Sequence, residues 1–305
     1  MSLDTELMWG SFDLVTQDEF ERRNPGARGV NLRLLELLRS HRLSATWAVV
    51  GHLFLRDDAA RCRGTVDEDV PWPSTPRSRA APSGDVITQP LWYAADLVAA
   101  IRSCDVPQEI ACHSFSHTTM NRLTADELRG ELRACAALAR ATGVGLKSFV
   151  FPHNVQAHHE TLRDEGFVCF RSDPLPDGGG VLRTPQRFVR YFGQFRRHAP
   201  AALPTRHRTG LLNIPSSMFL SPRHGLRRFV PIGRVLERAL SGIEQAVAER
   251  KVFHLYFHPF NLCSEPETLF WVLDRIFDRV ARLRDAGALD VLTMNEIAER
   301  CDAGS

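Results

Sequence analysis

The amino-acid sequence predicts a single-domain α/β barrel. Short apolar segments of strand character alternate with helical segments about six or seven times along the 305 residues, and no internal repeat or clear linker divides the chain. With 44% hydrophobic and 24% charged residues, the composition is that of a globular protein with a large core. Polar residues suited to catalysis follow several of the predicted strands, which is where the active site of such a barrel lies.

The beginning of the chain predicts a strand, a helix and a second strand. Residues 1–8 are interpreted as a strand end, and residues 29–42 carry leucines at helical spacing before a basic turn. Residues 44–51, Ser-Ala-Thr-Trp-Ala-Val-Val-Gly, form a short apolar run typical of a fully buried strand. This order implies two parallel strands joined by a right-handed crossover.

The alternation continues around two irregular segments, 56–90 and 174–231, which are rich in Pro and Arg and are expected to be long loops. In the second, Phe188–Arg197 mixes aromatic residues with arginines. A solvated helix with an aromatic edge is the favoured interpretation, and peripheral contact with an anionic membrane is the alternative.

Helices are expected at 91–103, 124–141 (opened by a capping box), 155–165, 234–250, 265–286 and up to 301, and strands at 147–152, 167–170, 252–257 and 290–293.

Charge, cysteines and the chain start limit the function. A net charge of +2 gives no electrostatic support for a nucleic-acid partner. Seven scattered cysteines without C-x-x-C pairs indicate reduced thiols. Neither a run of about 18 apolar residues nor a signal segment is found, so no transmembrane helix and a cytoplasmic location are expected. The first motif begins so early that we expect a short first strand or a start codon assigned too late.

Two histidines end the segment Glu-Ile-Ala-Cys-His-Ser-Phe-Ser-His, residues 109–117. If this turn is helical, a spacing of four residues puts His113 and His117 on one face, where both imidazoles reach a common divalent cation. In a chain with 12 histidines, chance explains such a pair about equally well. The interpretation therefore depends on carboxylates and further histidines at other strand ends.

Two carboxylates lie at the end of the first predicted strand. Asp4 and Glu6 alternate along it, so both side chains can face one site. Glu6 with two imidazoles makes a two-His, one-carboxylate metal site with open positions, and Asp4 is then free to act as a base. Asp13 is a rival carboxylate. The structural alternative is that Asp4 and Glu6 are solvated residues at a ragged N-terminus.

A late predicted strand adds one more candidate. In Val-Phe-His-Leu-Tyr-Phe-His-Pro-Phe-Asn, residues 252–261, His254 and His258 face the same side. His258 precedes a proline at the strand end, where a general acid is required. His254 is interpreted as a buried, hydrogen-bonded structural histidine.

The order of these motifs resembles the polysaccharide deacetylase family, carbohydrate esterase family 4. The resemblance covers roughly residues 3–300 and rests on Asp-x-Glu, Ala-Thr-Trp-Ala-Val-Val-Gly, His-Ser-Phe-Ser-His, Phe-Pro and a strand ending in Leu-x-x-His. It implies a distorted (β/α)7 barrel and one divalent metal ion, usually zinc.

The resemblance also implies roles for individual residues. The metal ligands would be Glu6, His113 and His117. Asp4 would be the catalytic base and His258 the catalytic acid.

The third motif departs from the family pattern. Where many members have Arg-x-Pro-Tyr, this chain has Val150-Phe-Pro-His153, so the arginine that orients the base is missing. We expect Arg171 to stand near the site and, together with His153 and Asn154, to supply polar contacts to the substrate. The family also has a fourth motif, which contains a tryptophan. We cannot place this motif in residues 174–231.

The implied activity is that of a metal-dependent carbohydrate de-N-acetylase, which hydrolyses an acetamido group on an amino sugar. Without an export signal, the expected substrate is an intracellular glycan, a lipid-linked or nucleotide-linked intermediate, or a glycosylated metabolite. Two alternatives stay open: a metal-dependent amidohydrolase acting on a non-sugar amide or ureide, and an inactive glycan-binding barrel.

Overall fold

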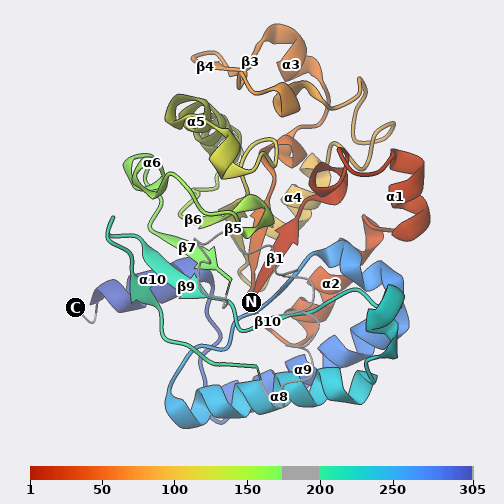
Figure 1. The fold of residues 1–305 in the computed structure, drawn as a ribbon, viewed down its shortest axis with the longest axis vertical. Coiled ribbons are helices and arrows are strands. Elements are labelled where there is room, and N and C mark those ends of the chain that lie inside the picture. Colours follow the sequence, from red (N-terminus) through yellow and green to blue (C-terminus); the bar gives the residue numbers. More distant parts are fainter. Residues whose placement is uncertain (174–198, 304–305) are drawn as a thin grey trace.

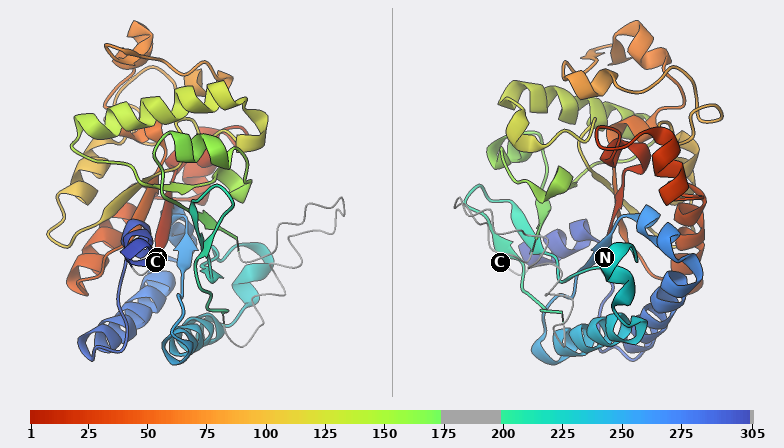
Figure 2. Two further views of the ribbon diagram at one scale, coloured as in Figure 1. Left: turned by 90° about the vertical axis from the view of Figure 1, so that its left-hand side faces the viewer. Right: turned by 45° about the vertical axis from the view of Figure 1, so that its right-hand side comes forward.

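The structure is a computed structural model that describes residues 1–173 and 199–303, and it consists of a curled sheet surrounded by helices (Figure 1). Among these described residues, the main sheet has nine strands in the order β10-β11-β1-β2-β5-β6-β7-β9-β8. Neighbouring strands are parallel except for the pair β8 and β9. The sheet forms a half-barrel within one α/β domain (Figure 2), which confirms the predicted fold class.

The strands of the main sheet are β1 (Ser2–Thr5), β2 (Thr46–Val49), β5 (Glu109–Cys112), β6 (Ser148–Val150), β7 (Cys169–Ser172), β8 (Thr205–Arg206), β9 (Leu212–Pro215), β10 (Met218–Phe219) and β11 (Leu255–Phe257). The helices are α1 (Gln17–Arg23), α2 (Gly29–Ser40), α3 (Ala59–Arg63), α4 (Ala95–Arg102), α5 (Ala125–Ala141), α6 (His159–Asp164), α8 (Ile232–Glu249), α9 (Pro266–Asp285) and α10 (Met294–Ala303).

The sequence explains the well-predicted elements. Every residue of β2 is buried between β1 and β5, as expected for a central parallel strand. The side chain of Thr124 accepts a hydrogen bond from the backbone N–H of Glu127, and the Glu127 carboxylate accepts one from the backbone N–H of Thr124. This is the predicted capping box, and it starts α5.

Two long segments were expected to be loops. Segment 56–90 holds α3, a separate hairpin of β3 (Thr65–Asp67) and β4 (Val70–Pro71), and the short 3-10 helix η3 (Pro76–Arg79). It lies at the upper end of the molecule in Figure 1. Within 174–231, by contrast, the structure shows that β8, β9 and β10 belong to the main sheet. These strands are only two to four residues long, too short to give a periodic pattern. Phe188–Arg197 lies outside the described residues.

The prediction of a strand at 290–293 was wrong. Thr293 instead precedes α10, and the Glu296 carboxylate accepts hydrogen bonds from the N–H and hydroxyl of Thr293 at 2.7 and 2.9 Å. This capping interaction starts a helix at a point where the apolar run suggested a strand. Within residues 1–173 and 199–303, no helix is both long enough and apolar enough to cross a membrane.

Candidate active site

Five predicted residues meet at the carboxyl ends of β1, β5 and β11. The Glu6 Oε1 atom lies 3.1 Å from Nε2 of His113 and 3.0 Å from Nε2 of His117. It also lies 3.2 Å from Nε2 of His258, which is itself 3.8 Å from Oδ2 of Asp4. Four of the five side chains are buried, and only His258 is partly exposed, at 26%. The site is therefore open to a ligand on the side of His258.

Glu6 stands at the centre of this group because of the turn that follows β1. The 3-10 helix η1 (Leu7–Gly10) folds the chain back, so that a Cβ built on Gly10 would lie 1.7 Å from Oε2 of Glu6. Only glycine leaves room for the carboxylate at this position. Burial raises the pKa of Glu6, but the neighbouring imidazoles of His258, His117 and His113 outweigh it and hold that pKa well below its usual value.

The loop that carries the paired histidines is not helical, contrary to the geometry considered from their spacing. Ser114 and His117 adopt left-handed backbone angles, with φ of 57° and 55°, and this brings the two imidazole rings to a centroid distance of 4.8 Å. The Nδ1 atom of His113 lies 2.7 Å from the carbonyl oxygen of Val150, to which it donates when protonated. Nε2 faces Glu6, and in the neutral tautomer that donates from Nδ1 this second nitrogen keeps its lone pair for a metal ion.

His117 has the character of a metal ligand. Its side chain is 1% exposed, and burial lowers its pKa to about 4, so the imidazole is neutral near pH 7. Within residues 1–173 and 199–303, neither of its ring nitrogens has a partner in hydrogen-bonding geometry. A buried imidazole without hydrogen bonds is costly unless its lone pair has another partner.

The donor set fits a divalent metal ion. One potential ligand atom from each of Glu6, His113 and His117 lies within 4.8 Å of the others. A carboxylate oxygen with two imidazole nitrogens suits zinc or a similar borderline ion, with positions left for water and substrate. Asp4, Glu6 and His258 form a second such group, but the unpartnered nitrogens of His117 favour the first.

Arg171 is buried and pairs with the carboxylate of Asp4. From β7, its Nη1 and Nη2 atoms donate to the two oxygens of Asp4 at 2.5 and 2.7 Å. Nη1 also donates to Ser2, and Nη2 donates to the side-chain oxygen of Asn154. Burial raises the pKa of Asp4, but the guanidinium outweighs this and lowers that pKa below its usual value. The sequence placed Arg171 near the site but did not identify its partner.

His258 and His153 line the open side. Burial lowers the pKa of His258, but the carboxylates of Glu6 and Asp4 outweigh it and raise that pKa above its usual value. The His258 ring stacks on Phe260 with centroids 5.1 Å apart. His153 is exposed, has a left-handed φ of 55°, and packs its ring edge to face against His117.

Two rival candidates lie away from this cluster. Asp13 accepts a hydrogen bond at 2.6 Å from Arg77, and its side chain is 40% exposed. His254 is buried at the opposite end of β11 and has Nε2 2.9 Å from the hydroxyl of Ser2.

Sequence reasoning missed two residues that hold the site loops, Arg77 and Glu131. Arg77 donates to the carbonyl oxygens of Trp9 and Ser116, and so joins the turn after Glu6 to the histidine loop. Glu131 is fully buried on α5 and binds the same loop. Its signal in the sequence was a carboxylate in the apolar stripe of a predicted helix.

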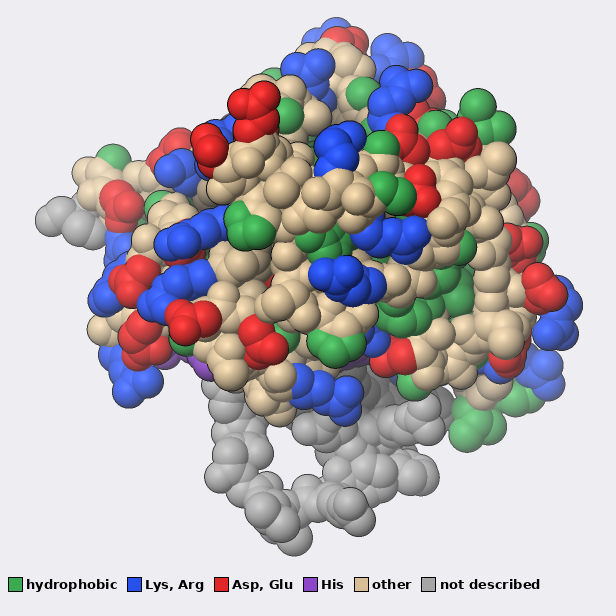
Figure 3. Space-filling view, turned by 90° about the horizontal axis from the view of Figure 1, so that it is seen from above, with side chains coloured by type: hydrophobic (Ala, Val, Ile, Leu, Met, Phe, Trp, Pro, Cys, Tyr) green, Lys and Arg blue, Asp and Glu red, His purple; other side chains and the backbone are tan. Residues whose placement is uncertain are grey.

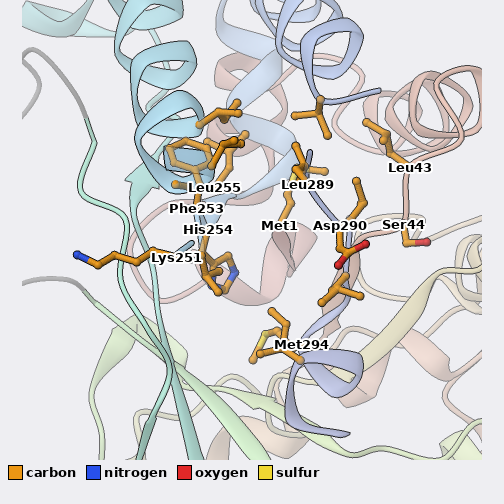
Figure 4. Close-up of a pocket in the computed structure, with 18 of the residues that line it drawn as sticks. Met1, Leu43, Ser44, Lys251, Phe253, His254, Leu255, Leu289, Asp290 and Met294 are labelled. Atoms are coloured by element: carbon orange, nitrogen blue, oxygen red, sulfur yellow. The ribbon is translucent and has the colours of Figure 1, made fainter. Parts of the chain in front are cut away.

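A cavity of about 540 Å³ is lined by none of the predicted site residues. It lies at the amino ends of the strands, where Leu255, Phe253 and Met294 line it together with His254 (Figure 4). On the face shown in Figure 3, basic and acidic side chains are mixed, which agrees with the small net charge.

No protein-family model and no curated protein matches the sequence. Solved structures do share its fold. A protein from Mycobacterium smegmatis provisionally described as a polysaccharide deacetylase aligns with a TM-score of 0.60 and 18% identity, over 100% of this chain and 89% of its own. Puue allantoinase aligns with a TM-score of 0.57 and 13% identity, over 99% and 83%. The 4-alpha-glucanotransferase from Thermococcus litoralis aligns with a TM-score of 0.54 and 12% identity, over 98% of this chain but 39% of its own. The chain therefore has a polysaccharide deacetylase-like fold.

Proposed function

We propose that this protein is a metal-dependent carbohydrate de-N-acetylase, a hydrolase that removes the N-acetyl group from an amino sugar. The observation that carries the proposal is the position of one Glu6 oxygen within 3.2 Å of three imidazoles, beside a second carboxylate held by an arginine. Such a group supplies metal ligands, a base and an acid in one place. The likeness of the fold to a polysaccharide deacetylase supports the same activity.

Glu6, His113 and His117 would hold the metal, for which zinc is the proposed ion. When bound, the ion would polarise the amide carbonyl and lower the pKa of a water molecule. The turn at Gly10 fixes Glu6, and the bond to Val150 fixes the tautomer of His113. These contacts orient the ligands before substrate binds.

The remaining residues handle protons. Asp4 is ionised and is oriented by two hydrogen bonds from Arg171, so it is the proposed base that removes a proton from the attacking water. His258 keeps its proton more readily than a free histidine and is the proposed acid for the departing nitrogen, which is a poor leaving group as an anion. Exposed His153, with Asn154 beside it, would contact the sugar.

The proposed substrate is an intracellular glycan, a lipid-linked or nucleotide-linked intermediate, or a glycosylated metabolite. The proposed location is cytoplasmic, as the scattered cysteines without C-x-x-C pairs in the sequence suggest. A second candidate is hydrolysis of a non-sugar amide or ureide. The likeness to an allantoinase favours it, because the TM-score of 0.57 is close to that of the deacetylase.

Metal content tests the proposal. We expect about one divalent ion per chain in the wild type, its loss in His113→Ala/His117→Ala, and its retention in the control His41→Ala/His224→Ala. Acetate release from N-acetyl amino sugars would then support the deacetylase, whereas hydrolysis of ureides without acetate release would support the second candidate. Wild-type protein that binds no metal, even after incubation with zinc, would overturn both and leave a glycan-binding barrel.

A further inference from the structure

Glu131 is a fully buried carboxylate directly behind the histidine loop. Its Oε2 atom accepts hydrogen bonds from the backbone N–H groups of Phe115 and Ser116, at 3.1 and 3.4 Å. Its Oε1 atom accepts hydrogen bonds from the hydroxyl groups of Ser116 and, at 2.8 Å, Thr75. Burial raises the pKa of Glu131 and the hydrogen bonds oppose this rise.

The histidine loop depends on such a partner because it has no regular secondary structure. Two of its residues, Ser114 and His117, adopt left-handed backbone angles, which cost free energy in non-glycine residues. Phe115 and Ser116, which lie between them, are buried, and within residues 1–173 and 199–303 their N–H groups have no backbone acceptor, so an acceptor must come from a side chain. Glu131 supplies it from α5.

The carbonyl groups of the same loop are held from the other side. The N–H groups of Gly51 and His52 donate to the carbonyl oxygens of Ser114 and Phe115, at 2.9 and 3.1 Å. A Cβ built on Gly51 would lie 2.9 Å from Cα of Phe115, so glycine permits this close approach. The start of the 3-10 helix η2 (Gly51–Phe54), which follows β2, and the carboxylate of Glu131 thus fix the loop between them.

We propose that Glu131 is a positioning residue for the metal site. It holds the segment between His113 and His117 in the backbone conformation that directs both imidazoles at Glu6. This inference rests on the proposed function, because it concerns the affinity of that site for its metal. Groups that orient metal ligands through hydrogen bonds typically change metal affinity by about 10- to 100-fold when they are lost.

The test compares Glu131→Gln with Glu109→Gln. Glu109 lies at the opposite end of β5 and accepts hydrogen bonds from the Thr46 hydroxyl and the Asn295 N–H, at 2.7 and 3.2 Å. Glutamine has an NH2 group where the carboxylate has an acceptor, so both variants are expected to lose stability. Only Glu131→Gln is expected to weaken zinc binding, by about 10- to 100-fold, in competition with a chromophoric chelator.

The outcomes separate this inference from the proposed function. Unchanged zinc affinity in folded Glu131→Gln, with zinc bound by the wild type, would overturn the inference alone. A wild type that binds no zinc would overturn the proposed function and the inference with it. If Glu131→Gln does not fold, Ser116→Ala removes one hydroxyl donor to Glu131, and we expect a smaller loss of zinc affinity. Unchanged affinity in that folded variant would overturn the inference.

Discussion

The two ends of the barrel differ in their buried groups. At the carboxyl ends of the strands, Asp4, Glu6 and Glu131 are buried, and each has cationic, imidazole or hydrogen-bond-donor partners. At the amino ends lies a cavity of about 540 Å³ with mainly apolar walls. Because buried charges are costly unless they are paired, the grouping of these three carboxylates at one end supports the site proposed there.

A line of hydrogen bonds connects the two ends through the barrel interior. Arg171 binds Asp4 and also donates to the hydroxyl of Ser2 at 2.9 Å. That hydroxyl lies 2.9 Å from Nε2 of His254, which lines the cavity. Since Ser2 accepts from the guanidinium, its own proton is free to be donated to His254. A change at Arg171 therefore affects both ends.

Arg171→Met is expected to have the largest effect. It leaves the buried carboxylate of Asp4 without its cation, and breaking a buried ion pair in this way typically costs about 3–5 kcal/mol. Urea unfolding measures the loss, and amide hydrolysis should fall sharply because the proposed base loses its orientation. The control is Arg206→Met, which removes an exposed ion pair with Asp302 and should change stability by less than about 1 kcal/mol. Equal losses in the two variants would contradict the contrast between buried and exposed pairs.

Gly10→Ala should lower stability and weaken zinc binding through a local change at the carboxyl ends of the strands. The new Cβ would occupy the position of Oε2 of Glu6, so the carboxylate must move or the turn must open. Overpacking of this kind costs about 1–3 kcal/mol, and we also expect weaker zinc binding in a chelator competition. Gly130→Ala in α5 is the control, because a Cβ there meets nothing within 4 Å and alanine favours a helix by up to about 1 kcal/mol. Normal zinc affinity in Gly10→Ala would show that Glu6 does not bind the metal from this position.

Buried histidines at both ends should make the free energy of unfolding depend on pH. His52 stacks on Trp9, and burial lowers its pKa to about 3. Because this value lies below the unfolded pKa of about 6.5, its contribution to stability is complete above pH 6.5 and is lost as the pH falls toward 3. From pH 6.5 to pH 5 the loss is about 2 kcal/mol. Measured by urea unfolding, the free energy of unfolding of His52→Gln should decrease less over this pH range than that of the wild type. Part of the decrease should remain, because burial also lowers the pKa of His254. Identical pH dependence in wild type and variant would mean that His52 is not buried as a neutral imidazole.

Motif residues could be predicted from the sequence because each follows a short apolar strand. Glu6 and His258 were found in this way, and the structure brings them together. Partners from distant elements could not be predicted, since local pattern carries no information on what a side chain meets across the barrel. Arg171 was placed near the site without its bond to Asp4, and Glu131 was not identified. The error at 290–293 has a similar cause, because Asp-Val-Leu-Thr suits a strand or the approach to a helix equally well until Thr293 meets Glu296.

The smallest effect is expected at the amino end. Ala246 on α8 lines the cavity, so Ala246→Leu adds apolar atoms to unfilled space and should raise the free energy of unfolding by about 1 kcal/mol. Urea unfolding measures this gain, and zinc affinity and amide hydrolysis should stay at wild-type values because the cavity holds none of the site residues. A loss of stability would show that the cavity does not accept a larger side chain. A stable variant with altered hydrolysis would show instead that the line through His254, Ser2 and Arg171 transmits changes at one end to Asp4 at the other.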